Sequence, residues 1–209
     1  MEHPVLSRIT REGFTPLGWF SPEDMGETKF VVHIGNAGPA MFQRFARDGG
    51  GGMDDWIKRV VDPLAADLGA TAAYPFDKPH LPFLSWARRG GAGHISPLGL
   101  NIHPTYGLWH AYRAALLFPV QFDLPHLSAG PHPCETCASK PCLSTCPVGA
   151  FDGTRYNVDN CGTYLKTGPG QDCMTGGCLA RRACPVGREY RYSAPQAQFH
   201  MKAFLAARG

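Results

Sequence analysis

The chain has 209 residues, of which 44% are hydrophobic and 18% are charged, and its formal net charge at pH 7 is +3. This composition is typical of a folded protein with a buried core, and it excludes an intrinsically disordered chain. The small net charge gives no indication of a nucleic-acid partner. We expect no membrane partner, because the longest apolar run covers only residues 114–120. We expect a cytoplasmic location, because the first residues do not resemble a secretory signal.

The first part of the chain shows alternating strand and helix patterns. Residues 29–34 are predicted to form a strand, and a turn over residues 35–39 leads into a helix that begins near Pro39 and ends at Arg47. Residues 53–68 have the apolar spacing of a helix, which Pro63 should kink or split.

Shorter elements follow these. Residues 71–76 are predicted as a short strand, residues 81–89 as a helix, and residues 98–102 and 112–120 as two strands joined by a turn at 103–107. This order indicates an α+β sheet domain over residues 1–124. Residues 125–133 are rich in proline and are predicted to be a linker, and residues 193–209 are predicted to contain a C-terminal helix.

The eight cysteines all lie between Cys134 and Cys184, in the C-terminal part of the chain. Their order is Cys134, Cys137, Cys142 and Cys146 in a first run, then Cys161, Cys173, Cys178 and Cys184. The sequence Cys-Pro-Val-Gly occurs twice, at residues 146–149 and 184–187, which suggests two similar sites built with approximate two-fold symmetry.

Cysteine runs of this kind are typical of two 4Fe-4S clusters. In two-cluster ferredoxins, the cysteine before proline in each run binds the other cluster. This rule assigns one cluster to Cys134, Cys137, Cys142 and Cys184, and the other to Cys146, Cys161, Cys173 and Cys178. The usual gap of two residues after the second cysteine is four residues here (138–141), so the hydrogen bonds to sulfur should differ locally.

Two other interpretations of the cysteines remain. A disulfide framework would need an oxidising compartment. Two all-cysteine zinc sites would favour paired Cys-x2-Cys motifs, and only Cys134 and Cys137 form such a pair.

Residues 134–187 resemble the double-cluster domain of epoxyqueuosine reductases and reductive dehalogenases. The resemblance rests on the first cysteine run, on Cys161 followed by Tyr164 and Leu165, and on the closing Cys-Pro. It implies a ferredoxin-like double-cluster domain over residues 134–192 and does not specify the substrate.

Residues 95–113 resemble a segment of the CblC-type cobalamin-processing proteins. The shared features are Ile-His-Pro, an aromatic residue before glycine, a tryptophan and a following arginine, and residues 36–42 show a weaker similarity. The resemblance implies that residues 1–124 form a trimmed nitroreductase-like, cobalamin-binding sheet domain. It also implies that Gly99, His103, Trp109 and Arg113 face the cofactor. The residue types add Gly107, which permits close backbone approach to a flat ligand, and Tyr106, which offers a flat apolar ring, to the predicted cofactor-binding set. A histidine before proline more often holds its loop through backbone hydrogen bonds, so we do not expect His103 to bind cobalt.

Without the resemblance, the same residues fit a turn followed by an ordinary core strand. With it, the sequence indicates an oxidoreductase that passes electrons from an unknown donor, through two clusters, to a cobalamin or related corrinoid for reduction or removal of its upper ligand. The alternatives are a ferredoxin-like electron carrier without cobalamin, a cobalamin-dependent reductase of another small molecule, and a structural zinc protein. No catalytic acid or base can be named from the sequence.

Overall fold

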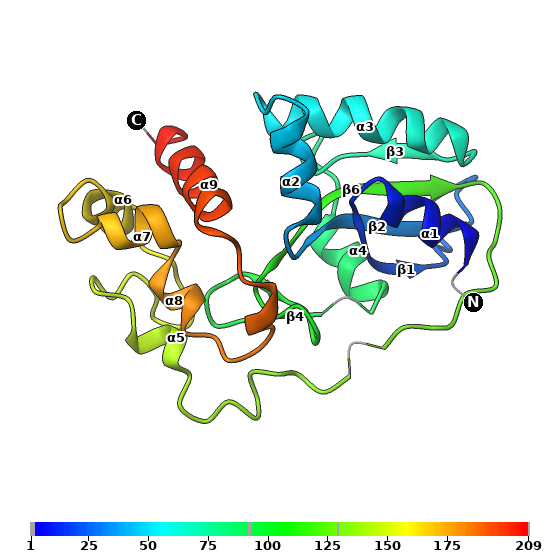
Figure 1. Ribbon diagram of the computed structural model, residues 1–209. Coiled ribbons are helices and arrows are strands. Elements are labelled where there is room, and N and C mark those ends of the chain that lie inside the picture. The colour runs from blue at the N-terminus through cyan, green and yellow to red at the C-terminus, as the bar shows by residue number, and fades with distance from the viewer. Residues whose placement is uncertain (1–2, 92, 129, 209) are drawn as a thin grey trace. The chain divides into compact units, whose positions relative to one another are not determined.

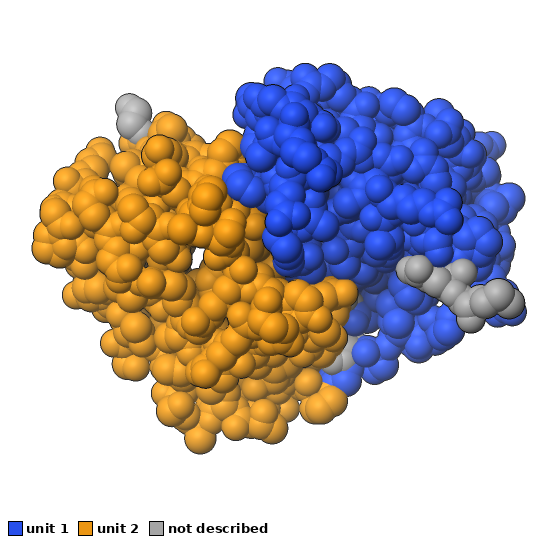
Figure 2. All heavy atoms as spheres, viewed as in Figure 1, with its two compact units in different colours: residues 1–93, 110–130 blue, residues 94–109, 131–209 orange. Residues whose placement is uncertain are grey.

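The computed structural model describes residues 3–91, 93–128 and 130–208 (Figure 1). The chain forms two compact units: unit 1 comprises residues 1–93 and 110–130, and unit 2 comprises residues 94–109 and 131–209 (Figure 2). The sequence-based division assigns residues 94–109 to the sheet domain. The structure groups them with the cysteine-rich part instead.

Unit 1 is built on a four-stranded antiparallel sheet. The strands are β1 (Thr15–Phe20), β2 (Phe30–Ala37), β3 (Thr71–Ala73) and β6 (His110–Phe118), in the order β1-β2-β6-β3. The central strand β6 places Ala114, Ala115 and Leu116 in the core with no exposed surface. The two alanines allow helices to pack closely on the sheet.

Four helices accompany this sheet (Figure 1): α1 (Pro4–Arg11), α2 (Ala40–Arg47), α3 (Met53–Asp67) and α4 (Phe83–Arg89). Helix α3 packs on β3 and β6. Helix α4 contributes Phe83 and Trp86 to an apolar cluster with Phe20 and Val31 of the sheet. Burial of these aromatic side chains stabilises this face of the sheet.

Several elements predicted for residues 1–124 are present, and three details differ. Helix α3 continues without interruption through Pro63, because the buried side chains of Val61 and Leu64 hold its two halves on the same core. The predicted strand over residues 71–76 is reduced to β3. The predicted strand over residues 98–102 is reduced to β5 (Asn101–Ile102), which pairs with β4 (His94–Ile95) rather than with β6, because the intervening Ser96 and Leu100 close a tight turn.

Unit 2 consists of β4 and β5, short helices around the cysteines, and a longer C-terminal helix. The helices are α5 (Pro141–Ser144), α6 (Val158–Leu165), α7 (Gln171–Gly176), α8 (Leu179–Arg182), the 3-10 turn Arg188–Tyr190, and α9 (Ala194–Ala206). Helix α9 corresponds to the predicted C-terminal helix and packs on α7. The core of the unit contains Leu98, Ile102, Leu108, Ala150, Phe151, Ala180 and Cys184. Within the described residues, no helix is long and apolar enough to cross a membrane.

Candidate functional site

The first group of cysteines surrounds a hollow in unit 2. Cys134 and Cys137 lie in the loop before α5, Cys142 lies in α5, and Cys184 follows α8. The hollow contains about 310 Å³ of space that protein atoms do not fill, part of it open to solvent. Its remaining walls are Pro97, Ile102, Pro133, Lys140, Pro141, Pro185 and Val186.

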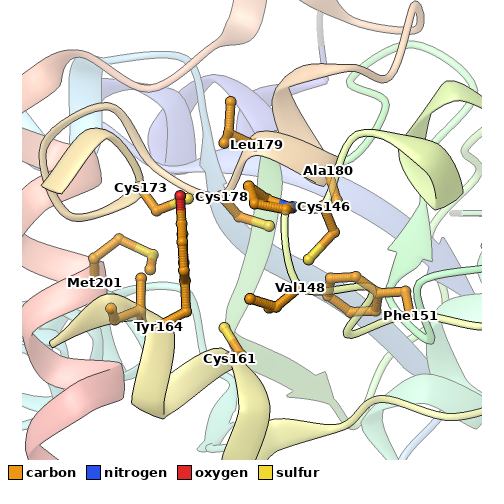
Figure 3. Close-up of a pocket in the computed structure, with 12 residues that line it drawn as sticks. Cys146, Val148, Phe151, Cys161, Tyr164, Cys173, Cys178, Leu179, Ala180 and Met201 are labelled. Atoms are coloured by element: carbon orange, nitrogen blue, oxygen red, sulfur yellow. The ribbon is translucent and has the colours of Figure 1, made fainter. Parts of the chain in front are cut away.

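The second group surrounds a hollow of similar size, about 330 Å³. Cys146 follows α5, Cys161 lies in α6, Cys173 lies in α7, and Cys178 precedes α8. Figure 3 shows these four side chains around the space that Val148 and Phe151 also border. The two groups of four coincide with the two sets that the crossover rule predicts, with no cysteine left over.

The thiols of each group affect one another electrostatically. Burial raises the pKa of Cys134 to about 11, and the neighbouring Cys184, Cys142 and Cys137 add to the shift. Burial likewise raises the pKa of Cys178, with Cys173 and Cys161 as its neighbours. These thiols therefore retain their protons at neutral pH unless a metal displaces them, as a thiolate-binding metal does.

The arrangement of the sulfur atoms can be compared with the three interpretations of the cysteines. All eight cysteines are free thiols, so the structure contains no disulfide framework. Among the described residues, no three His, Cys, Asp or Glu side chains are grouped closely enough to hold a single metal ion. A zinc site needs four donors around one ion, whereas a four-iron cluster binds each thiolate through a separate iron. Four sulfurs around a hollow fit the second requirement better.

The residues predicted to bind cobalamin are divided between the two units. Gly99, His103, Tyr106, Gly107 and Trp109 belong to unit 2, whereas Arg113 belongs to unit 1. The Nε of Arg113 donates to the side-chain oxygen of Asn36 on the adjacent strand, over 3.1 Å. Within neither unit does the structure bring all six residues together.

The turn at His103 is held by its own side chain. The Nδ1 atom of His103 accepts hydrogen bonds from the backbone N–H groups of Thr105 (3.0 Å) and Tyr106 (3.3 Å). Burial lowers the pKa of His103 to about 4, so the ring is neutral and its Nδ1 stays an acceptor. This is the loop-holding role expected for a histidine before proline.

Gly107 and Trp109 serve packing within unit 2. A Cβ atom on Gly107 would lie 2.1 Å from the carbonyl oxygen of Val186, so the glycine permits close approach to protein backbone. Trp109 is 2% exposed, its ring lies 4.7 Å from the guanidinium carbon of Arg181, and it packs edge-on against Tyr192. Neither residue presents a free apolar surface to a flat ligand. At Gly99, in contrast, a Cβ atom would meet no other atom within 4 Å.

A larger cavity of unit 2 adjoins the second cysteine group. It contains about 740 Å³ of unfilled space, part of it open to solvent, and Cys161 and Cys178 line both this cavity and the second hollow. Its other walls are Leu98, Leu100, Phe151, Tyr156, Arg181, His200, Met201 and Phe204.

Sequence reasoning did not select these cavity residues. Leu98 and Leu100 do belong to the segment that resembles CblC, and Leu100 is 45% exposed. The exposure of Leu100 is a property of the folded chain, so the sequence offered no signal for it beyond the resemblance itself. Tyr156 had no signal, because its place in the cavity depends on its bridge to Phe151.

Comparison with known proteins shows similarity of fold. No family model and no curated protein matches the chain by sequence. An epoxyqueuosine reductase from Bacillus subtilis has 17% identity and a TM-score of 0.52, over 93% of this chain and 67% of that one. An epoxyqueuosine reductase bound to a modified tRNA stem loop has 17% identity and a TM-score of 0.53, over the same shares of both chains.

The B12-trafficking protein CblC from C. elegans is similar at 15% identity with a TM-score of 0.52, over 94% of this chain and 89% of that one. At these identities the similarity establishes the mixed α/β fold with its small antiparallel sheet.

Proposed function

We propose that this protein is an iron–sulfur redox protein that holds two 4Fe-4S clusters and delivers electrons to a cobalamin. The observation that carries the proposal is the division of all eight cysteines into two groups of four, each around its own hollow. Four thiolates per cluster is the donor set that such clusters require, and when bound they accept and donate single electrons.

The protein's own groups prepare each hollow for a cluster. Cys173 and Cys184 are each only 6% exposed, so part of each group is protected from water. The backbone N–H of Ala150 donates to the sulfur of Cys146 over 3.3 Å. Hydrogen bonds to cluster sulfurs are among the factors that set the reduction potential.

The cobalamin part of the proposal rests on a different observation. Leu98 and Leu100, from the segment that resembles CblC, line the cavity that also reaches Cys161 and Cys178. We therefore place the cobalamin at this cavity, with the ring of Tyr156 and the two leucines as apolar walls. This replaces the predicted contacts through Gly107 and Trp109, which protein packing occupies.

Anaerobic reconstitution tests the clusters first. We expect a brown protein with about eight irons per chain, and a loss of about four irons in each of the variants Cys134→Ser and Cys161→Ser, because one belongs to each group. Colourless protein that binds two zinc ions and cannot be reduced would overturn the proposal.

Titration with cobalamin then tests the acceptor, with the visible spectrum as the measurement. Leu100→Glu places a charge in the cavity, and we expect it to weaken cobalamin binding at least about tenfold without changing the iron content. Leu84→Glu is the matched control, since Leu84 is 50% exposed and lies on α4 of unit 1. If cobalamin causes no spectral change in the wild-type protein, the function is that of an electron carrier without cobalamin.

A further inference from the structure

Lys140 has an unusual backbone conformation. Its φ is 37° and its ψ is 57°, and among the described residues it is the one non-glycine residue with positive φ. The left-handed region is unfavourable for a side chain with a Cβ atom. The residue before a proline is also biased toward extended backbone, and Pro141 follows directly.

This conformation places Lys140 beside the first group of cysteines. The residue lies in the four-residue gap between Cys137 and Cys142, and its carbonyl accepts the N–H of Leu143 over 2.9 Å at the start of α5. Lys140 is half-buried and lines the first hollow. Because Lys140 shares this hollow with the four cysteines, its positive charge acts on their sulfurs.

The second hollow has no such cation among the described residues that line it. Its lining consists of cysteines and uncharged side chains. Arg182, which acts on Cys173, forms an ion pair with Asp172 over 2.5 Å, so its charge is largely compensated. Arg181 lines the adjoining cavity, where it lies over Trp109 and Tyr192 and donates to the carbonyl of Leu108, and it does not line the hollow itself. The two hollows therefore differ in the charge of the residues that line them.

We propose that Lys140 raises the reduction potential of the cluster held by Cys134, Cys137, Cys142 and Cys184, and that its left-handed backbone positions it to do so. The proposal rests on the proposed iron–sulfur function. Reduction adds one negative charge to a cluster, and a nearby cation stabilises the reduced form relative to the oxidised form. Arg188 and Arg191 act on Cys184 from exposed positions, where solvent screens them more strongly.

A redox titration followed by electron paramagnetic resonance measures this effect on the reconstituted full chain. Lys140→Gln removes the charge, and we expect the first cluster to be several-fold more oxidised than in the wild type at a fixed potential, with the second cluster unchanged. Lys140→Arg keeps the charge and should restore wild-type behaviour. Lys166→Gln is the control for net charge, because Lys166 is exposed and lines neither hollow.

The role of position is tested by the double variant Ser139→Lys, Lys140→Asn. It keeps the net charge, and asparagine tolerates the left-handed region. We expect it to behave like Lys140→Gln. Equal potentials in Lys140→Gln and the wild type, at full iron content, would overturn the inference while leaving the proposed function intact. Failure of the wild-type chain to assemble clusters would instead refute the proposed function.

Discussion

Two glycines of the segment 94–109 allow a direct test of what that segment does. Gly99 and Gly107 both have positive φ, 73° and 56°. An alanine at either position therefore meets a similar backbone penalty of about 1 kcal/mol. The space around them differs, because a Cβ on Gly107 would lie 2.1 Å from the carbonyl oxygen of Val186 and a Cβ on Gly99 would meet nothing within 4 Å.

Gly99→Ala should lower the free energy of unfolding by about 1 kcal/mol. Gly107→Ala should lower it by a further 1 to 3 kcal/mol, roughly, because the backbone on one side of the contact must move to relieve it. Val186 follows Cys184 by two residues, so that movement should also loosen the first cysteine group. We therefore expect Gly107→Ala to lose iron from that group, and Gly99→Ala to retain it.

Thermal unfolding of the reconstituted protein and iron analysis measure these two effects. A difference of about 1 kcal/mol corresponds to a shift of roughly 2 to 4 °C in Tm for a chain of this size. The alternative, that both glycines line a corrin, predicts weaker cobalamin binding in both variants and similar stability. Equal Tm values and equal iron contents in the two variants would refute the packing role of Gly107.

Three further outcomes are expected from other parts of the structure. His33 is fully buried among aromatic rings, and burial lowers its pKa from 6.5 to about 3. As the pH falls below about 6.5, His33 is protonated in the unfolded state but not in the folded state. Its contribution to the free energy of unfolding should therefore fall by about 2 kcal/mol by pH 5. His33→Leu should remove this contribution, as measured by thermal unfolding at pH 7.5 and pH 5, whereas the similar contribution of His103, whose pKa burial lowers to about 4, should remain. Arg181 lies over the rings of Trp109 and Tyr192 and donates to the carbonyl of Leu108. Arg181→Lys should therefore lower the free energy of unfolding by about 1 to 2 kcal/mol. An unchanged Tm would contradict the stacking role of the guanidinium group. Pro63→Ala should raise the stability of unit 1 by about 1 to 3 kcal/mol in the same assay, because it restores a helix hydrogen bond inside α3.

The grouping of the cysteines was accessible from sequence because it follows from chain spacing. Short loops bring neighbouring thiols together, and the crossover rule then places Cys146 and Cys184 in opposite groups. Each of these cysteines precedes a Pro-Val-Gly turn whose glycine has positive φ, 56° at Gly149 and 67° at Gly187. The repeat in the sequence therefore corresponds to a repeat in backbone conformation.

The packing partners of the segment 94–109 could not be predicted from the sequence. Apolar spacing indicates that a segment is extended and partly buried, but it does not state which strand is the partner. Ile102 pairs with His94 rather than with β6, and the contact between Gly107 and Val186 joins residues that are far apart in the chain. Only the three-dimensional structure shows that the glycine accommodates protein backbone.

Helix α1 and strand β1 were not predicted, because their local sequence signals are weak. Helix α1 begins with His3 as its N-cap, whose Nδ1 accepts the N–H of Val5 over 3.3 Å, and histidine is not among the common capping residues. Pro4 in the first turn was the available signal. Strand β1 contains Pro16 and Gly18, which weaken a strand pattern, and the register of its pairing shifts between these two residues.

The segment 94–109 connects the two proposed activities of unit 2. Pro97 and Ile102 line the first hollow, whereas Leu98 and Leu100 line the cavity beside the second cysteine group. Neighbouring residues of one short segment therefore border a cluster site and the proposed cobalamin site. A ligand in the cavity that displaces Leu98 must also act on Pro97, because the two residues share a peptide bond. If binding favours one arrangement of the segment, cobalamin affinity and the potential of the first cluster are thermodynamically linked, and each must change the other by the same free energy.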